Sequence, residues 1–219
     1  MNFINRMVNI KTFSTLAFLV IFLGFGLQSC SKTEIKSEPN SDKVEVLRTE
    51  QRKLWSDHMH WTLATVDAFF YEPSQLNSKL ARLMQNQEDI GNSIKPYYGA
   101  AAGDQLTALL KEHIQLAVPV LTAAKNGDQS ALGTAVADWK VNAKEIADFL
   151  TSANDKNWPA SVTEPHMEGH IDQTIDYSVK VLTEDYAGGL TSFEFALNHM
   201  LGLADVLTNG ISKQFPDKF

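Results

Sequence analysis

From Val44 to the C-terminus, apolar residues recur at intervals of three and four almost without a break. That spacing puts them on one face of a helix, and no alternating pattern of useful length indicates a strand. Short stretches rich in proline, glycine or asparagine divide the pattern into segments. The sequence therefore predicts an all-α fold: an up-and-down helical bundle of about six helices with a four-helix core.

The breaks in the pattern set the expected ends of the helices. The second helix should stop before Pro96, which lacks a backbone donor. Gly127-Asp128 indicates a left-handed stop followed by an N-cap. Ser161-x-x-Glu164 and Thr191-x-x-Glu194 have the spacing of capping boxes, the second one after a break at Gly188-Gly189. The expected helices are residues 44–70, 75–94, 102–126, 129–152, 162–184 and 192–213.

The N-terminus has the order of a secretory signal. Arg6 and Lys11 form a basic start, and an apolar run follows over residues 13–27. Residues 27–30, Leu-Gln-Ser-Cys, resemble the lipobox of bacterial lipoproteins. The resemblance implies that Cys30 becomes the lipidated first residue of the mature protein. The alternative is an uncleaved membrane anchor, for which the apolar run is at the short limit.

We therefore expect three parts: a lipoprotein signal peptide (1–29), a lipidated cysteine with a flexible tether (30–43), and a helical bundle domain (44–219). The expected location is the bacterial cell envelope, with the domain outside the cytoplasm and attached to a membrane through Cys30. Because Cys30 is the only cysteine, the monomer has no internal disulfide and no thiolate metal cluster.

The net charge limits the partners. The chain carries a formal charge of −7, which repels phosphate backbones, so nucleic-acid binding is not expected. There is no phosphate loop, no G-x-S-x-G elbow, no C-x-x-C-H haem attachment and no calcium loop. The sequence gives no protein partner.

Histidines supply the best candidate chemistry. Four of the six follow the apolar line of their helix, one each on the first, third, fifth and sixth: His58, His113, His170 and His199. Single imidazoles that project inward from facing helices can form a metal site in a bundle. Neutral imidazole suits zinc, copper or iron. His60 lies about 200° round the helix from His58 and should be solvated.

We therefore expect a lipid-anchored binding or sensing protein that holds a small ligand, with a transition metal favoured over haem. Asp89, Asn142, Glu145 and Asp205 are the candidate polar partners around the histidines. A second interpretation is a non-catalytic structural or interaction module, in which the histidines are packed core residues. A third is a metal-dependent enzyme on a DinB-like bundle, an analogy that rests on histidines in a helical core alone.

Four stretches are similar to a family of small all-helical bacterial proteins with no assigned function. They are LW-x-x-H-x-x-WT (54–62), NQEDIGNSIKPYYG (86–99), LTALLKEHI (106–114) and ISKQFPDKF (211–219). The resemblance supports an all-α fold and leaves function open. The motif residues that carry over are His58, Trp61, Asp89, Gly91, Lys95, Pro96, Tyr97, Tyr98 and His113.

Overall fold

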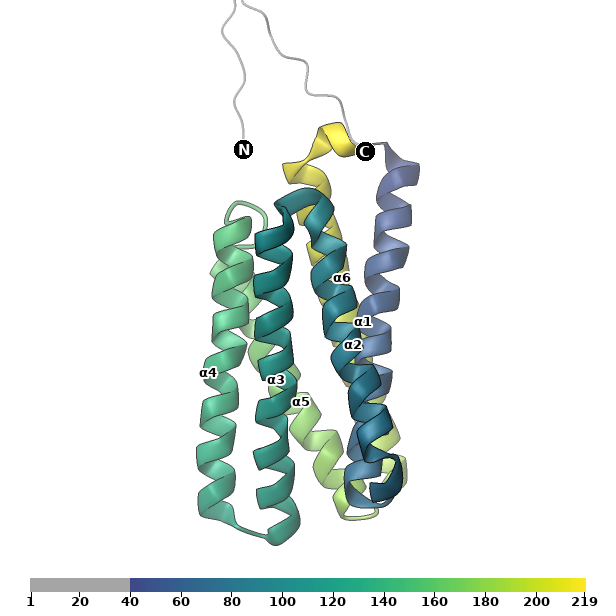
Figure 1. Cartoon of the computed structure of the whole chain (residues 1–219), viewed down its shortest axis with the longest axis vertical. Coiled ribbons are helices and arrows are strands. Elements are labelled where there is room, and N and C mark those ends of the chain that lie inside the picture. The colour runs from purple at the N-terminus through teal and green to yellow at the C-terminus, as the bar shows by residue number, and fades with distance from the viewer. Residues whose placement is uncertain (1–39) are drawn as a thin grey trace, which may run out of the picture. The chain divides into compact units, whose positions relative to one another are not determined.

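The computed structural model describes residues 40–219, and the predicted signal, lipobox and most of the tether lie outside these residues. The described part is an all-α bundle of six long helices (Figure 1), as predicted. Their bounds are α1 Ser41–Phe70, α2 Pro73–Tyr98, α3 Ala100–Asn126, α4 Gln129–Ala153, α5 Ala160–Leu182 and α6 Tyr186–Gln214, followed by a 3₁₀ turn, η1, at Pro216–Lys218.

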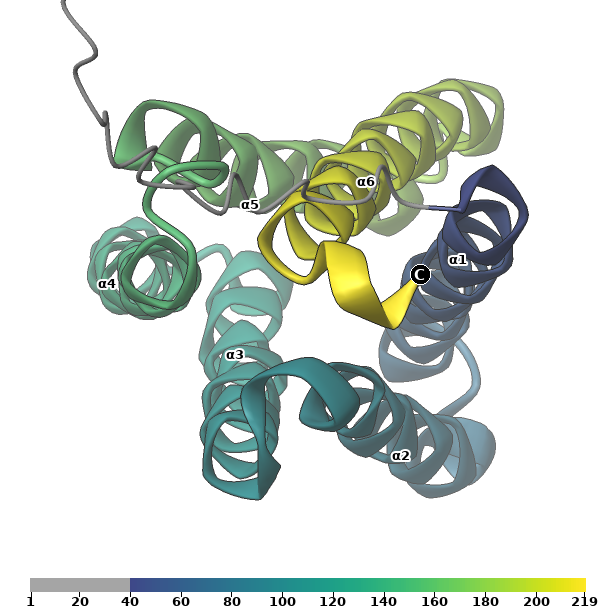
Figure 2. The same ribbon diagram turned by 90° about the horizontal axis from the view of Figure 1, so that it is seen from above.

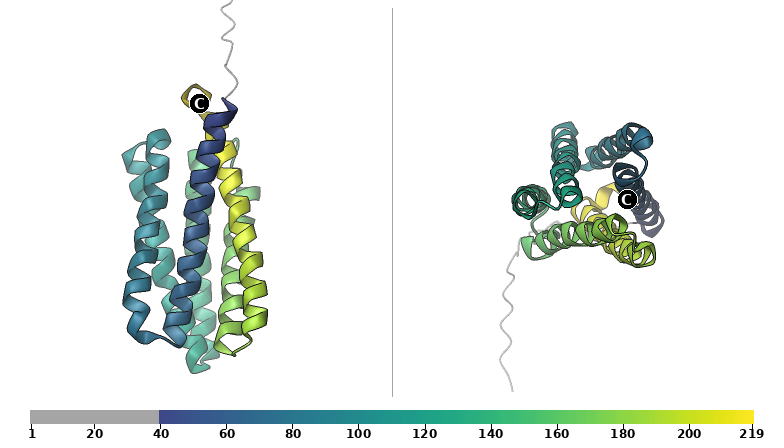
Figure 3. Two further views of the ribbon diagram at one scale, coloured as in Figure 1. Left: turned by 90° about the vertical axis from the view of Figure 1, so that its right-hand side faces the viewer. Right: turned by 90° about the horizontal axis from the view of Figure 1, so that it is seen from below.

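Successive helices run in opposite directions, and each packs against its neighbours in the chain. Seen from above, α1 to α6 follow one another round a ring that closes where α6 lies against α1 (Figures 2 and 3). The C-terminal ends of α1, α3 and α5 therefore lie at the same end of the bundle, which we call the lower end because it is at the bottom of Figure 1. None of the helices in residues 40–219 combines the length and the hydrophobicity that a membrane span requires.

Two predicted helix boundaries are correct because local backbone chemistry sets them. Gly127 ends α3 with φ 69°, a conformation that glycine adopts without steric cost. Asp128 then caps α4, and its carboxylate accepts a hydrogen bond from the Ala131 amide at 3.0 Å.

Two predicted helix starts are wrong, and so is one predicted helix end, described below. Both capping boxes lie inside helices: α5 already begins at Ala160, and α6 begins at Tyr186, so Gly188-Gly189 is helical. The cap of α6 is Asp185, whose carboxylate accepts from the Gly188 amide at 3.0 Å.

The second helix continues through Pro96 to Tyr98. Proline removes one hydrogen bond there, but aromatic packing stabilises the extra turn. Tyr97 stacks on Phe219 at 5.7 Å, and Tyr98 packs against Trp158 at 5.6 Å between ring centroids.

Two glycines allow α2 and α3 to approach closely. A Cβ atom on Gly91 would overlap the Thr107 side chain and lie 2.5 Å from the Gly103 carbonyl oxygen. A Cβ atom on Gly103 would in turn lie 2.6 Å from the Gly91 carbonyl oxygen. The glycine of the NQEDIGN stretch is therefore required by helix packing.

Candidate functional site

Three of the four predicted histidines form a cluster halfway along the bundle. His58 on α1, His113 on α3 and His170 on α5 are each 2% exposed. The His170 ring is 5.5 Å from the His58 ring and 5.5 Å from the His113 ring, between centroids. One imidazole from each of three helices thus reaches the same level of the core, and the burial of all three agrees with the apolar line of each helix.

The hydrogen bonds of His113 determine where its proton lies. Its Nδ1 atom is 2.9 Å from Oδ1 of Asn142. The Asn142 amide nitrogen donates to the Leu109 carbonyl at 3.2 Å, which fixes the amide so that Oδ1 faces the imidazole. His113 Nδ1 is therefore the N–H donor, and Nε2 has a free lone pair. That Nε2 atom is buried and has no hydrogen-bond partner.

His58 has the opposite arrangement. Its Nδ1 atom lies 3.3 Å from Nε2 of Gln87. Because this Gln87 nitrogen also donates to the Leu83 carbonyl at 2.7 Å, it is a donor, so His58 Nδ1 accepts and its proton sits on Nε2. The third ring, His170, has a buried Nδ1 atom with no partner.

All three imidazoles are held neutral. Burial lowers the pKa of His58 to about 3, with a further contribution from the neighbouring His113. Burial likewise lowers the pKa of His113 to about 4. The pKa of His170 lies well below its ordinary value, first because of burial and then because of the other histidines. The cluster is therefore an uncharged polar group in the core.

Directly below the histidines is a cavity of about 150 Å³. The described residues that line it come from α1 to α5, and none is acidic, lysine or arginine. Three of the four hydroxyl groups in its wall bond to their own helices: Thr62 to the His58 carbonyl, Thr65 to the Trp61 carbonyl, and Ser178 to the Thr174 carbonyl. The fourth, Thr174 Oγ1, is buried without a hydrogen-bond partner. The surface that these residues offer to a ligand is therefore almost entirely hydrocarbon.

The residues that line the cavity extend along the bundle. The lining covers His58–Phe70 on α1, His113–Ala124 on α3 and His170–Val179 on α5. At 1.5 Å per residue these spans are about 18, 16 and 13 Å long. Because the three helices run the same way, the histidines mark the inner end of the cavity and the last residues of each span mark its lower end. Two lining residues, Val118 and Val179, are 40% and 43% exposed and mark the opening.

The fourth predicted ligand, His199, does not join the cluster. It pairs with His166: the rings are 4.8 Å apart, and His199 Nε2 donates to the His166 carbonyl at 2.9 Å. His60 is exposed, as expected, and its Nδ1 atom bonds to the Ser56 carbonyl at 2.8 Å.

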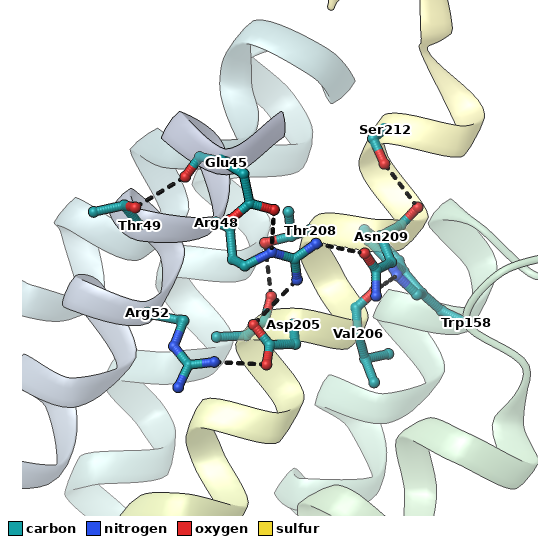
Figure 4. A network of polar contacts seen from close by, with 11 residues as sticks. Glu45, Arg48, Thr49, Arg52, Trp158, Asp205, Val206, Thr208, Asn209 and Ser212 are labelled. Carbon is teal, nitrogen blue, oxygen red and sulfur yellow. Dashed lines mark hydrogen bonds and ion pairs between the residues drawn. The ribbon is translucent and has the colours of Figure 1, made fainter. Parts of the chain in front are cut away.

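One of the four candidate polar partners, Asn142, contacts a clustered histidine. Asp89 instead faces Arg82 at 3.6 Å on the surface. Asp205 forms ion pairs with Arg48 at 3.2 Å and Arg52 at 2.7 Å, where α1 meets α6 (Figure 4).

The fourth candidate, Glu145, is exposed on α4. In the described part of the chain, residues 40–219, no acidic side chain is buried in this core. A buried carboxylate would need a positive partner, and the neutral imidazoles do not supply one.

Sequence reasoning missed Gln87, which is fully buried and holds His58. The same sequence feature that indicated the histidines could have indicated Gln87: it is a polar residue on the apolar line of its helix, between Leu83 and Ile90. The cavity had no comparable signal, since most of its lining residues are ordinary apolar core positions spread over five helices.

Among residues 40–219, no group of three or more histidine, cysteine or acidic side chains has an arrangement that could hold a metal ion. Comparison of the chain with protein-family models, with curated proteins and with solved structures gives no match. Function therefore has to be inferred from the geometry of the bundle itself.

Proposed function

We propose that this protein binds a small, mainly apolar ligand in the cavity between α1 and α5. The observation that carries the proposal is the elongated, charge-free cavity beside three neutral imidazoles. A concave apolar site with a few polar groups at one end is the usual form of a small-molecule site. Each buried methylene group would contribute about 0.8 kcal/mol to binding.

The test is binding of the fluorescent probe N-phenylnaphthylamine to the purified protein. The variant Ala117→Phe places a ring inside the cavity, because Ala117 lines it. The matched control is Ala137→Phe on the exposed face of α4. We expect the wild type and the control to bind the probe and Ala117→Phe to lose it. Equal binding by all three proteins would refute the cavity as the site.

A second candidate ligand, a transition-metal ion, is favoured by a separate observation. His113 Nε2 and His170 Nδ1 are buried without partners, and neutral imidazole nitrogens of this kind bind zinc, copper and iron. If the ligand is a metal ion, His58, His113 and His170 are the residues that bind it. The ion would need a small shift of the rings, and His58 would have to give up the proton on Nε2 or its hydrogen bond from Gln87, since the present arrangement does not form a metal site.

Metal content and visible absorbance of the protein, purified without a histidine tag, test the metal candidate. Stoichiometric metal that disappears in a His58→Ala, His113→Ala double variant, and persists in His60→Ala, would support it. A protein that takes up neither added metal nor the apolar probe would leave the interpretation of packed core histidines in a structural or interaction module.

The predicted lipid on Cys30 supports a location at the cell envelope, with the bundle outside the cytoplasm. Replacement of Cys30 by serine removes the only thiol that can carry the lipid. This proposal is independent of what the cavity binds.

A further inference from the structure

We infer that the ligand is a single-chain fatty acid, with its hydrocarbon tail in the cavity and its carboxylate beside Lys125 at the lower end. This inference rests on the proposed function and adds the shape and the charge of the ligand to it. Three observations carry it: the form of the cavity, the chemistry of its inner end, and the surroundings of Lys125.

The form of the cavity fits one chain. The lining extends over about 13 to 18 Å on the three helices that run in the same direction. A volume of about 150 Å³ distributed over that length makes a narrow channel. A cavity of similar volume but compact shape would hold a single ring. An unbranched chain matches a lining of this length better than a compact ring or a branched group does.

The inner end cannot receive the charged group. His58, His113 and His170 are neutral there, and no lysine or arginine lines the cavity. A carboxylate buried without a positive partner costs several kcal/mol. The hydrocarbon end of the ligand must therefore point toward the histidines, and the head group must remain at the lower end.

Lys125 is a cation next to the lining residues at that lower end. It follows the lining residue Ala124, in the last turn of α3. Its ammonium nitrogen lies 5.5 Å from the centroid of the Phe69 ring, which also lines the cavity, and 3.4 Å from the Phe69 carbonyl oxygen. Lys125 lies seven residues after Val118, on nearly the same face of α3 and about 10 Å further toward the lower end. Its contacts with Phe69 place the ammonium group beside the lower end of the cavity.

Lys125 also lacks a carboxylate partner among residues 40–219, unlike two other lysines at the lower end of the bundle. Lys79 pairs with Glu72 at 2.7 Å, and Lys180 pairs with Asp176 at 2.9 Å. An exposed ammonium group without a carboxylate partner, beside an apolar channel, is complementary to an amphipathic anion.

The experiment measures displacement of N-phenylnaphthylamine by linear ligands below their critical micelle concentrations. For the saturated carboxylates from hexanoate upward, we expect affinity to rise about fourfold per methylene group and to level off once the chain exceeds the channel. Dodecanoate should bind about two- to fivefold more tightly than dodecanol, and dodecyltrimethylammonium should bind more weakly than both.

The variant Lys125→Gln should abolish the preference for dodecanoate over dodecanol and leave dodecanol affinity unchanged. Lys156→Gln is the matched control, since Lys156 is an exposed lysine in the α4–α5 loop at the other end of the bundle. It should behave as wild type.

Three results would overturn the inference while probe binding, and with it the proposed function, remained intact. One is equal preference for dodecanoate in wild type and Lys125→Gln. Another is tighter binding of cyclic or branched carboxylates than of linear ones with the same number of carbons. The third is tighter binding of dodecyl phosphate than of dodecanoate, which would assign the site to a phosphate head group.

Discussion

Acidification from pH 7.5 to pH 5.5 should destabilise the bundle by about 4 kcal/mol. The reason is the histidine cluster. In the folded protein the pKa values of His58 and His113 are lowered to about 3 and about 4, and that of His170 lies well below its ordinary value of 6.5. The unfolded chain therefore binds protons below pH 6.5 that the folded chain does not, and stability falls as the pH falls.

The magnitude follows from the position of pH 5.5. It lies one unit below the ordinary histidine pKa of 6.5 and above the folded pKa values of about 3 and about 4. Each pKa unit corresponds to about 1.4 kcal/mol, so three histidines contribute about 4 kcal/mol between them. The loss should continue with further acidification and level off once the pH is below the folded values. Typical domains have a total stability of about 5–15 kcal/mol, so the effect is large.

Urea unfolding followed by tryptophan fluorescence measures this effect directly. With a slope of about 2 kcal/mol/M, the midpoint should fall by roughly 2 M between pH 7.5 and pH 5.5. The variant His113→Leu should reduce the pH-dependent loss by about a third, while His60→Gln, at an exposed position, should retain the whole of it. A midpoint that does not change over this pH range would refute the assignment of three buried, neutral imidazoles.

Further predictions concern packing, hydrogen bonding and the N-terminus. Gly91→Ala should destabilise the protein by about 1–3 kcal/mol, because its Cβ atom would meet α3. Gly133→Ala, where a Cβ atom meets nothing within 4 Å, should instead stabilise it by about 0.5–1 kcal/mol in the same thermal or urea unfolding assay. Asn142→Leu should cost about 1–3 kcal/mol, since the buried His113 N–H loses its acceptor; a smaller loss in urea unfolding would mean that water replaces the amide. Cys30→Ser should abolish incorporation of labelled fatty acid and move the protein from the membrane fraction to the soluble one, whereas retention in the membrane would favour an uncleaved anchor.

The histidine cluster shows which features of the site the sequence predicts and which it does not. The apolar line of each helix correctly indicated that His58, His113 and His170 are buried. The same line did not show that His199 pairs with His166, because periodicity gives the face of a helix but not the height at which two helices meet. That height depends on where each helix begins, and the start of α6 at Tyr186 was predicted six residues too late.

By itself, the sequence determined the all-α class, the number of helices and the buried face of most of them, because each of these follows from spacing along a single helix. Stops such as Gly127 were also readable, since one residue's backbone preference sets them. The tertiary structure alone decided the tautomer of His113, the cavity and the position of Lys125 beside Phe69. Each of these depends on side chains from helices far apart in the chain, and their relative positions are fixed only when the helices pack.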